Sequence, residues 1–167
     1  MAKPGQNIAS FTDLYQRMVG DRPLVGSLLT GHLAIEFLLR RLVAQYDARL
    51  AEHADTLRHH ALITLNHQIG TISEEQRDVL TAINRLRNKL AHQISFEPSM
   101  EELRQLWVQA SGAFSDLTDG ISQGIDALGS AASLVAVEEW ILPELFVQIC
   151  YDLHGKYVER GGDDEAF

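Results

Sequence analysis

Residues 84–93, NRLRNKLAHQ, gather reactive side chains into one short stretch of an otherwise leucine-rich pattern. Two arginines, a lysine and a histidine lie within it. A guanidinium group holds a phosphate in a planar fork, and an imidazole can take up or release a proton near neutral pH. These residue types therefore predict either a compact phosphate site with acid–base chemistry or, more simply, a solvated helix face.

The spacing sorts this stretch into two faces of a helix. At about 100° per residue, one face must be the core side, because it carries Val79, Leu80, Ile83, Leu86 and Leu90. Arg85, Asn88 and His92 fall together on the opposite face. Arg87 lies at the edge of the apolar stripe, about 140° from His92. The simpler alternative is a solvent-facing surface with His92 near a helix C-terminus, where a cation is favoured.

Apolar periodicity along the rest of the chain predicts an all-α fold, an up-and-down bundle of about five to six helices. No sustained alternation of apolar and polar residues indicates strands. Two capping boxes, Ser73 with Gln76 and Ser99 with Glu102, mark helix starts. Helices are expected over residues 10–19, 22–50, 55–67, 74–91, 99–121 and 131–158.

Glycine and proline mark the expected interruptions. The segment 119–130, DGISQGIDALGS, is expected to be a loop or a frayed helix end because it carries three glycines. The last helix is expected to bend or break at Pro143. On the helix of residues 22–50, Gly26 with Thr30 and Ser27 with Gly31 place small residues four apart, which favours a close helix contact.

Length and composition bound the class of protein. At 167 residues the chain is expected to form a single domain, residues 1–160, followed by a disordered acidic tail, residues 161–167. The single cysteine, Cys150, excludes an internal disulfide and lies in an apolar stretch typical of an inert core thiol. The most hydrophobic window, residues 24–43, is interrupted by charges, which argues against a membrane span. We expect a cytoplasmic protein.

The net charge of −9 argues against general nucleic-acid binding, and we expect no binding to double-stranded DNA. Residues 105–167 hold two lysines and arginines against eleven aspartates and glutamates. The middle of the chain is nearly neutral and contains the basic cluster of Arg85, Arg87 and Lys89. A compact phosphate-binding site, with Lys89 as one contact, therefore remains compatible with the charge.

The segment RLRNKLAH resembles the signature of the HEPN superfamily, the higher eukaryotes and prokaryotes nucleotide-binding domain. That signature is an arginine followed, after four to six residues, by a histidine, often with an asparagine directly after the arginine. Arg87, Asn88 and His92 match the shorter spacing, and Arg85 with His92 matches the longer one. Residues 20–110 as a whole resemble HEPN-like proteins, including the mannitol operon repressor group.

The resemblance implies a homodimer that pairs through the long early helix and the motif helix. It also implies a metal-independent endoribonuclease, without a cofactor, whose cleft forms where two motif helices meet. Arg87 and His92 would be its catalytic residues, with Asn88, Arg85 and Glu36 in support. The alternative for Glu36 is a surface or half-buried glutamate paired with Arg40 one turn on. An RNA substrate fits this chemistry, since cleavage by internal attack needs a base for the 2′-hydroxyl, an acid for the 5′-oxygen and a cation for the phosphate.

Other functions remain open. In toxin members controlled by a nucleotidyltransferase antitoxin, a tyrosine often follows the histidine by two positions, and here that residue is Ile94. Several relatives keep only the scaffold, so a regulator that binds a cognate protein partner or antitoxin is the first alternative. A helper module that senses a nucleotide through Arg87 and His92 is the second.

The remaining histidines raise the question of a metal site. His53, His59, His60 and His67 follow one another closely, yet no cysteine or nearby carboxylate completes a ligand set. His32 and Glu36, four apart, could be ligands, but a buried hydrogen-bonded pair is the preferred interpretation. We therefore predict no metal site.

Overall fold

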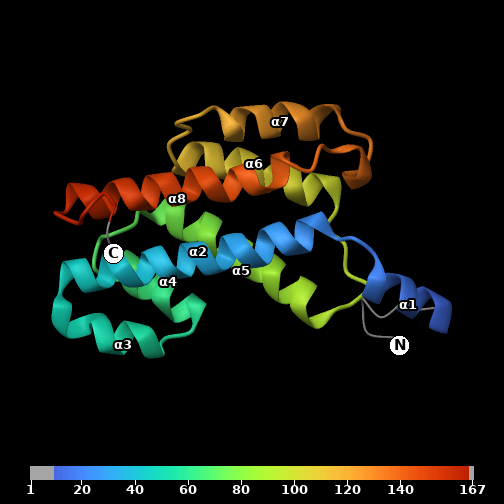
Figure 1. Cartoon of the computed structure of the whole chain (residues 1–167). Coiled ribbons are helices and arrows are strands. Elements are labelled where there is room, and N and C mark those ends of the chain that lie inside the picture. Colours follow the sequence, from blue (N-terminus) through green and yellow to red (C-terminus); the bar gives the residue numbers. More distant parts are fainter. Residues whose placement is uncertain (1–9, 166–167) are drawn as a thin grey trace.

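The computed structural model describes residues 10–165, and within that range the chain is all-helical. Eight α-helices and two short 3-10 helices form a bundle without strands in the described residues (Figure 1). The prediction of an all-α bundle is confirmed, with a slightly higher helix count than expected. The helices are α1 Phe11–Val19, α2 Pro23–Tyr46, α3 Ala51–Thr56, α4 His59–Gln68, α5 Glu74–His92, α6 Met100–Ala113, α7 Gly120–Ser130 and α8 Ile141–Glu159.

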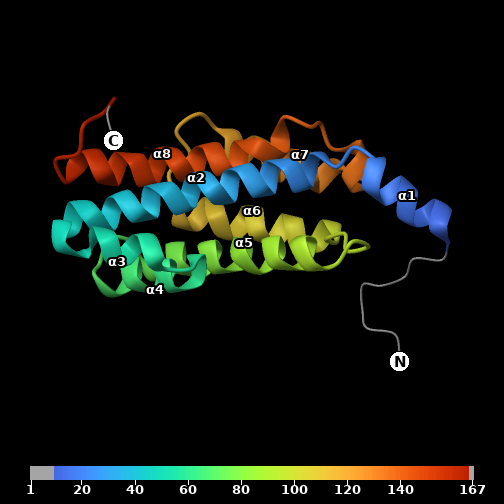
Figure 2. The same ribbon diagram turned by 60° about the horizontal axis from the view of Figure 1, so that its bottom comes forward.

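Helix α2 organises the bundle. It lies along α8 on one side and contacts α3, α4 and α5 on the other (Figure 2). Its core stripe, which includes Ile35, Leu39 and Leu42, is fully buried. The core continues through Leu80 and Ile83 of α5 into the other helices of the bundle. Helix α2 thus packs against the apolar face of α5, and the opposite face of α5 carries Arg85 and His92.

Both capping boxes form as the sequence predicts. The Ser73 hydroxyl accepts from the Gln76 amide at 3.2 Å, and the Gln76 side chain accepts from the Ser73 amide at 3.1 Å. Ser99 and Glu102 make the equivalent pair at the start of α6. The described helix α5 then runs without interruption to His92, one residue past the predicted end. These local signals fixed the position of the motif helix correctly.

Two expected helix boundaries between residues 46 and 59 are wrong. Helix α2 ends at Tyr46 because Asp47 is extended and its carboxylate accepts from the Arg49 amide, which starts the 3-10 helix Ala48–Leu50. The expected helix over 55–67 is two helices, α3 and α4. They are separated at Leu57 and Arg58, whose backbones are extended.

The expected loop over 119–130 is also wrong, because this segment forms α7. The Asp116 carboxylate accepts from the Ile121 and Ser122 amides, so it stabilises the first turn. Gly124 packs against the indole of Trp107, and a side chain at that position would collide with the ring. The expected helix over 99–121 accordingly ends at Ala113, with an extended Phe114 after it.

The last expected helix starts later than predicted. Residues 131–140 contain only the 3-10 helix Leu134–Ala136, and α8 begins at Ile141. Pro143 lies in the first turn of α8, where its missing amide hydrogen is not needed, so it causes no break.

The expected acidic tail is described as far as residue 165. Residues 166–167, and residues 1–9 of the expected single domain, lie outside the described residues. None of the described helices combines the length and the apolar character that a membrane span requires.

Candidate functional site

The outward face of α5 carries the polar set that the helical spacing predicts. Arg85 and His92 are exposed, and Asn88 is half-buried between them. The helix ends in a regular turn, in which the Gln93 amide donates to the Lys89 carbonyl at 2.9 Å. We call Arg85, Asn88 and His92 the motif face.

Arg87 points to a different side of the helix. It is half-buried, and its Nη1 donates to the side-chain Oδ1 of Asn88 at 3.1 Å. Burial lowers the pKa of His32 on α2, and the positive charge of Arg87 acts in the same direction. The Arg87 Nε is buried without a hydrogen-bond partner among the described residues. The regular helix therefore places Arg85 and His92 on one face and Arg87 on the side that faces α2. Asn88, on the motif face, is the hydrogen-bond partner of Arg87.

Lys89, the expected phosphate contact, already has partners within the chain. Its ammonium nitrogen lies 3.5 Å from Glu102 on α6 and 5.2 Å from the centre of the Phe96 ring. Both contacts are exposed and weak, so the side chain can leave them at small cost. Lys89 borders the motif face from the α6 side.

A buried polar cluster lies between α2, α4 and α5, and Glu36 is at its centre. Arg40 pairs with one oxygen of Glu36, and the His59 Nδ1 lies 3.2 Å from the other. The His59 ring stacks on the His32 ring, with centroids 3.8 Å apart. We call this group the buried polar cluster: Arg40, Glu36, His59, His32, Asn84 and Arg87.

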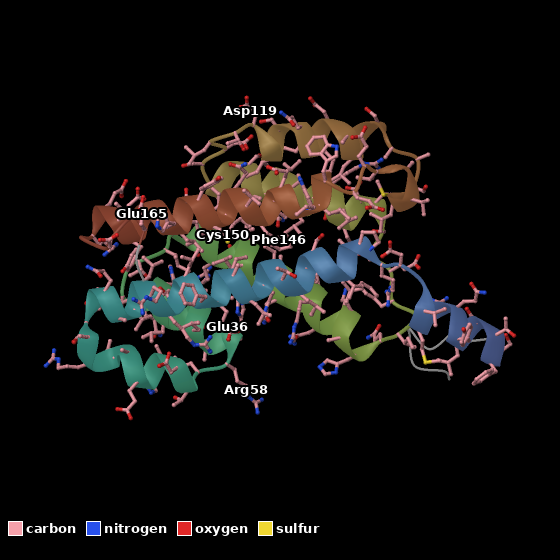
Figure 3. All side chains as sticks on the ribbon, viewed as in Figure 1. Glu36, Arg58, Asp119, Phe146, Cys150 and Glu165 are labelled. Atoms are coloured by element: carbon pink, nitrogen blue, oxygen red, sulfur yellow. The ribbon has the colours of Figure 1, made fainter. Side chains whose placement is uncertain are left out.

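The cluster continues from the stacked rings to the motif helix. The His32 Nε2 lies 3.4 Å from the side-chain Oδ1 of Asn84 on α5. Arg40 also donates to the carbonyls of Ala54 and Leu57, which ties the cluster to the turn between α3 and α4. Figure 3 shows Glu36 on the α4 side of α2, opposite the side that faces α8. Glu36 thus reaches the motif helix only through the two histidines.

Burial controls the protonation of this cluster. Burial lowers the pKa of His59 to about 4, and the nearby charges of His32 and Arg40 act in the same direction. Burial also lowers the pKa of His32. Burial alone would raise the pKa of Glu36, but hydrogen bonds and charges from Arg40 and His59 outweigh that effect and lower it. At neutral pH the cluster therefore holds two neutral imidazoles and an ionised carboxylate.

His32, Glu36 and His59 are also the three described side chains that could bind a metal together, since their ligand atoms lie within 4.8 Å of one another. Two imidazoles on one tetrahedral zinc ion, with nitrogens about 2.0 Å from the metal, would hold their ring centroids about 5 Å apart. The observed rings are closer, and Arg40 already neutralises the carboxylate. This geometry favours a hydrogen-bonded cluster over a metal centre.

An exposed apolar stripe runs along α2, at the level of the part of α5 that holds Arg85. Leu29, Leu33 and Phe37 are 40%, 64% and 45% exposed. His32 lies opposite Asn84, and Leu24 and Leu90 line one pocket at the bundle end, so α2 and α5 are antiparallel. This register places Leu29 at the level of Arg87 and Asn88. An interface formed on this stripe would therefore lie at the level of Arg85 and Asn88, and His92 lies beyond its end.

The sequence-based interpretation of His32 and Glu36 as a buried hydrogen-bonded pair is wrong, because His32 pairs with Asn84 and the half-buried Glu36 pairs with Arg40 and His59. His59 stands between them, and the pairing of His32 with Asn84 was not foreseen. The four-residue spacing of His32 and Glu36 at the edge of the α2 core stripe was the available signal. The contribution of α4 depends on the turn at Leu57 and Arg58, which the sequence pattern did not indicate.

Comparison of the chain with protein-family models, curated proteins and solved structures finds no match.

Proposed function

We propose that this protein is a metal-independent, HEPN-type endoribonuclease of the cytoplasm that acts as a homodimer. The observation that carries the proposal is that Arg85 and His92 are both exposed on the motif helix, with the exposed apolar stripe of α2 at the level of Arg85. Burial of that stripe against a second copy would bring two motif faces to one interface. A two-fold axis would then supply two imidazoles and two exposed guanidinium groups to one cleft.

The proposed chemistry is cleavage by internal attack. The His92 of one copy takes the proton from a ribose 2′-hydroxyl, whose oxygen attacks the adjacent phosphorus. The P–O5′ bond breaks, and the His92 of the other copy gives a proton to the leaving 5′-oxygen. The products are a 2′,3′-cyclic phosphate and a 5′-hydroxyl. Arg85 balances the charge on the phosphate, and Asn88 hydrogen-bonds to it.

Arg87 has a supporting role in this proposal. Its guanidinium group lies beside the motif face, bonded to Asn88, and its charge strengthens the positive potential where a phosphate would sit. This differs from the sequence-based expectation, in which Arg87 is the catalytic arginine. The proposal gives Glu36 a structural role, because it is bound to Arg40 and His59.

The test uses purified protein, total RNA and EDTA. Wild-type protein should cut RNA and leave 2′,3′-cyclic phosphate ends, while a DNA strand of the same sequence stays intact because it lacks the 2′-hydroxyl. His92→Ala should abolish the cleavage. His60→Ala is the matched control, because His60 is an exposed helical histidine outside the motif face. Cleavage that survives His92→Ala would refute the proposal.

A second candidate function is a regulator that binds a cognate protein partner or antitoxin and cuts no RNA. The observation in its favour is an exposed apolar and acidic surface before α8. Val135 is 96% exposed and Trp140 is 46% exposed, next to the exposed carboxylates of Glu138 and Glu139. RNA that remains intact at high protein concentration would favour this function. Nucleotide binding without cleavage would instead favour the phosphate-sensing helper module.

A further inference from the structure

Helix α1 is well formed, yet it contributes no buried residue to the bundle. Its first turn is capped by Ser10, whose hydroxyl accepts from the Asp13 amide at 3.1 Å, and Arg17 pairs with Asp13. Figures 1 and 2 both show α1 projecting from the end of the bundle where α2 begins. A nine-residue helix is not stable by itself in water, since isolated helices need about 12 residues or more. Its stability therefore calls for a contact beyond the bundle of its own chain.

One side of α1 is apolar and uncovered. Phe11, Tyr15 and Met18, at spacings of four and three, are 76%, 51% and 58% exposed. Leu14 lies on the same side and is half-buried. The opposite side carries Gln16 and other polar residues. This pattern is typical of a helix that lies in an apolar groove.

The bundle has a groove of matching chemistry and length between α2 and α8. It encloses about 420 Å³ and is lined by small or apolar side chains, apart from His154 at one end: Ser27, Thr30, Gly31, Ala34, Leu38, Pro143, Phe146, Val147, Cys150 and Tyr151. On α2 it spans residues 27–38, which is about 17 Å of helix, and α1 is about 14 Å long. Figure 3 shows Phe146 and Cys150 near each other on α8, on the side of that helix that faces α2.

The shape of the groove comes from small residues on α2. Phe146 occupies the space where a side chain at Gly31 would lie. Val147 and Tyr151 on the α8 side are 37% and 48% exposed, so the groove presents apolar surface to solvent. The small residues that the sequence placed four apart therefore serve two purposes. They admit Phe146 from α8 and leave a shallow channel above it.

The linker between α1 and α2 directs α1 away from its own groove. Gly20 and Arg22 are both outside the helical region, and Arg22 is restricted to extended conformations because Pro23 follows it. The Arg22 guanidinium also donates to the Phe96 carbonyl at 3.0 Å, which ties the linker to the segment after α5. A fold-back of α1 onto residues 27–38 of the same chain would require this linker to reverse direction.

We propose that α1 of each copy lies in the α2–α8 groove of a second copy, so that two chains exchange their N-terminal helices. Short, extended hinge segments favour such an exchange, and a two-fold axis makes it self-limiting. Two arms together offer four aromatic side chains, and with the groove counted the buried area is on the order of 1,000 Å², the size of a specific interface. The inference rests on α1 and the groove and is independent of RNA cleavage.

Cys150 provides a direct test, because the single cysteine of the chain lies in the groove. Tyr15→Cys and Met18→Cys place a second thiol on the apolar side of α1, and Gln16→Cys places one on the polar side. Under mild oxidation, at least one of the first two should give a dimer joined from α1 to Cys150, identified by peptide mapping. The Gln16→Cys variant should not, and the added change Cys150→Ser should abolish the link. A disulfide within one chain, or none, would overturn the exchange.

A second measurement needs no engineered disulfide. The double variant Phe11→Glu, Tyr15→Glu changes two side chains outside the core, so the bundle should fold as before. Its Cys150 should react with iodoacetamide about tenfold faster than in the wild type, because thiol reactivity follows access. The protein should also move from dimer towards monomer in analytical ultracentrifugation. Gln16→Glu should change neither property. An unchanged alkylation rate, or a wild-type protein that is already monomeric, would contradict the proposal.

Discussion

The motif face and the buried polar cluster both combine histidine, arginine and asparagine on or beside α5, but they differ in access to water. His92 and Arg85 are exposed, whereas His32 and His59 retain only 4% and 7% of their accessible surface. Burial holds the buried imidazoles neutral and keeps them from a polymeric substrate. We therefore assign the proposed cleavage chemistry to the motif face. The buried polar cluster is assigned a role in positioning the helices.

The largest difference between effects on RNA cleavage and effects on stability is expected for the histidines. His92→Gln should lower RNA cleavage by about 10²- to 10⁴-fold, because it removes a general acid–base group. It should change the free energy of unfolding by less than about 0.5 kcal/mol, since the side chain is exposed. Single-turnover cleavage and urea unfolding measure the two quantities. If His92→Gln instead lowers the free energy of unfolding enough to account for the lost cleavage, His92 has a structural role like the histidines of the buried polar cluster.

The two arginines should separate in the same way. Arg85→Ala should reduce cleavage by about 10²-fold or more, through loss of a cation at the phosphate, with little effect on stability. Arg87→Ala should reduce the free energy of unfolding by about 1–2 kcal/mol, because a half-buried side chain and its bond to Asn88 are lost. Cleavage assays and unfolding curves on both variants decide the assignment. If Arg87→Ala alone loses activity at unchanged stability, Arg87 is the catalytic arginine.

Glu36→Ala should act on stability. It removes the partner of Arg40 and of His59 and leaves a partly buried guanidinium without its carboxylate, at a cost of about 2–4 kcal/mol. Glu52→Ala on α3 is the exposed control and should cost less than about 0.5 kcal/mol. Chemical unfolding at pH 7 gives both values. Equal effects would show that the cluster contributes nothing to the fold.

Acid should destabilise the protein through the same cluster. Because the pKa of His59 falls from 6.5 in the unfolded chain to about 4 in the fold, the unfolded state binds the extra proton between these values. The free energy of unfolding should decrease by about 1.4 kcal/mol per pH unit as pH falls from 6.5 towards 4. His59→Gln should flatten that slope in unfolding curves taken at pH 7, 6 and 5. An unchanged slope would mean that other groups carry the acid sensitivity.

Lys89→Ala should have the smallest effect. Its ion pair with Glu102 and its contact with Phe96 are exposed, and their loss should cost less than about 1 kcal/mol. Cleavage should fall only modestly, with a weaker dependence on salt, if the ammonium group contacts phosphate. A salt series of cleavage rates for the variant and the wild type tests this, and identical salt dependence would remove Lys89 from the site.

Local signals predicted the motif helix well and its surroundings poorly. The capping box at Ser73 and the periodic leucines fixed α5 to within one residue, because both depend on neighbours in the sequence. The outward position of Arg85 and His92 followed from the same arithmetic. The regular geometry of an α-helix was therefore enough to predict which residues lie on the motif face.

The errors arose where tertiary contacts override local preference. Gly120 and Gly124 suggested a loop, but the absence of side chains there makes room for Gln148 and Trp107. The resulting helix is held against the core by the buried side chains of Ile121 and Leu128. That apolar spacing was the signal in favour of α7. The buried polar cluster could not be predicted, since His59 reaches Glu36 only after α3 and α4 separate.

The shared cleft can be tested directly by titration of His92→Ala protein into a fixed amount of wild-type protein. After the subunits re-equilibrate, mixed dimers carry one His92, so RNA cleavage by the wild-type chains should fall as the variant is added. If each chain instead contains a complete site, cleavage will stay constant throughout the titration, and the account of a composite site will be wrong.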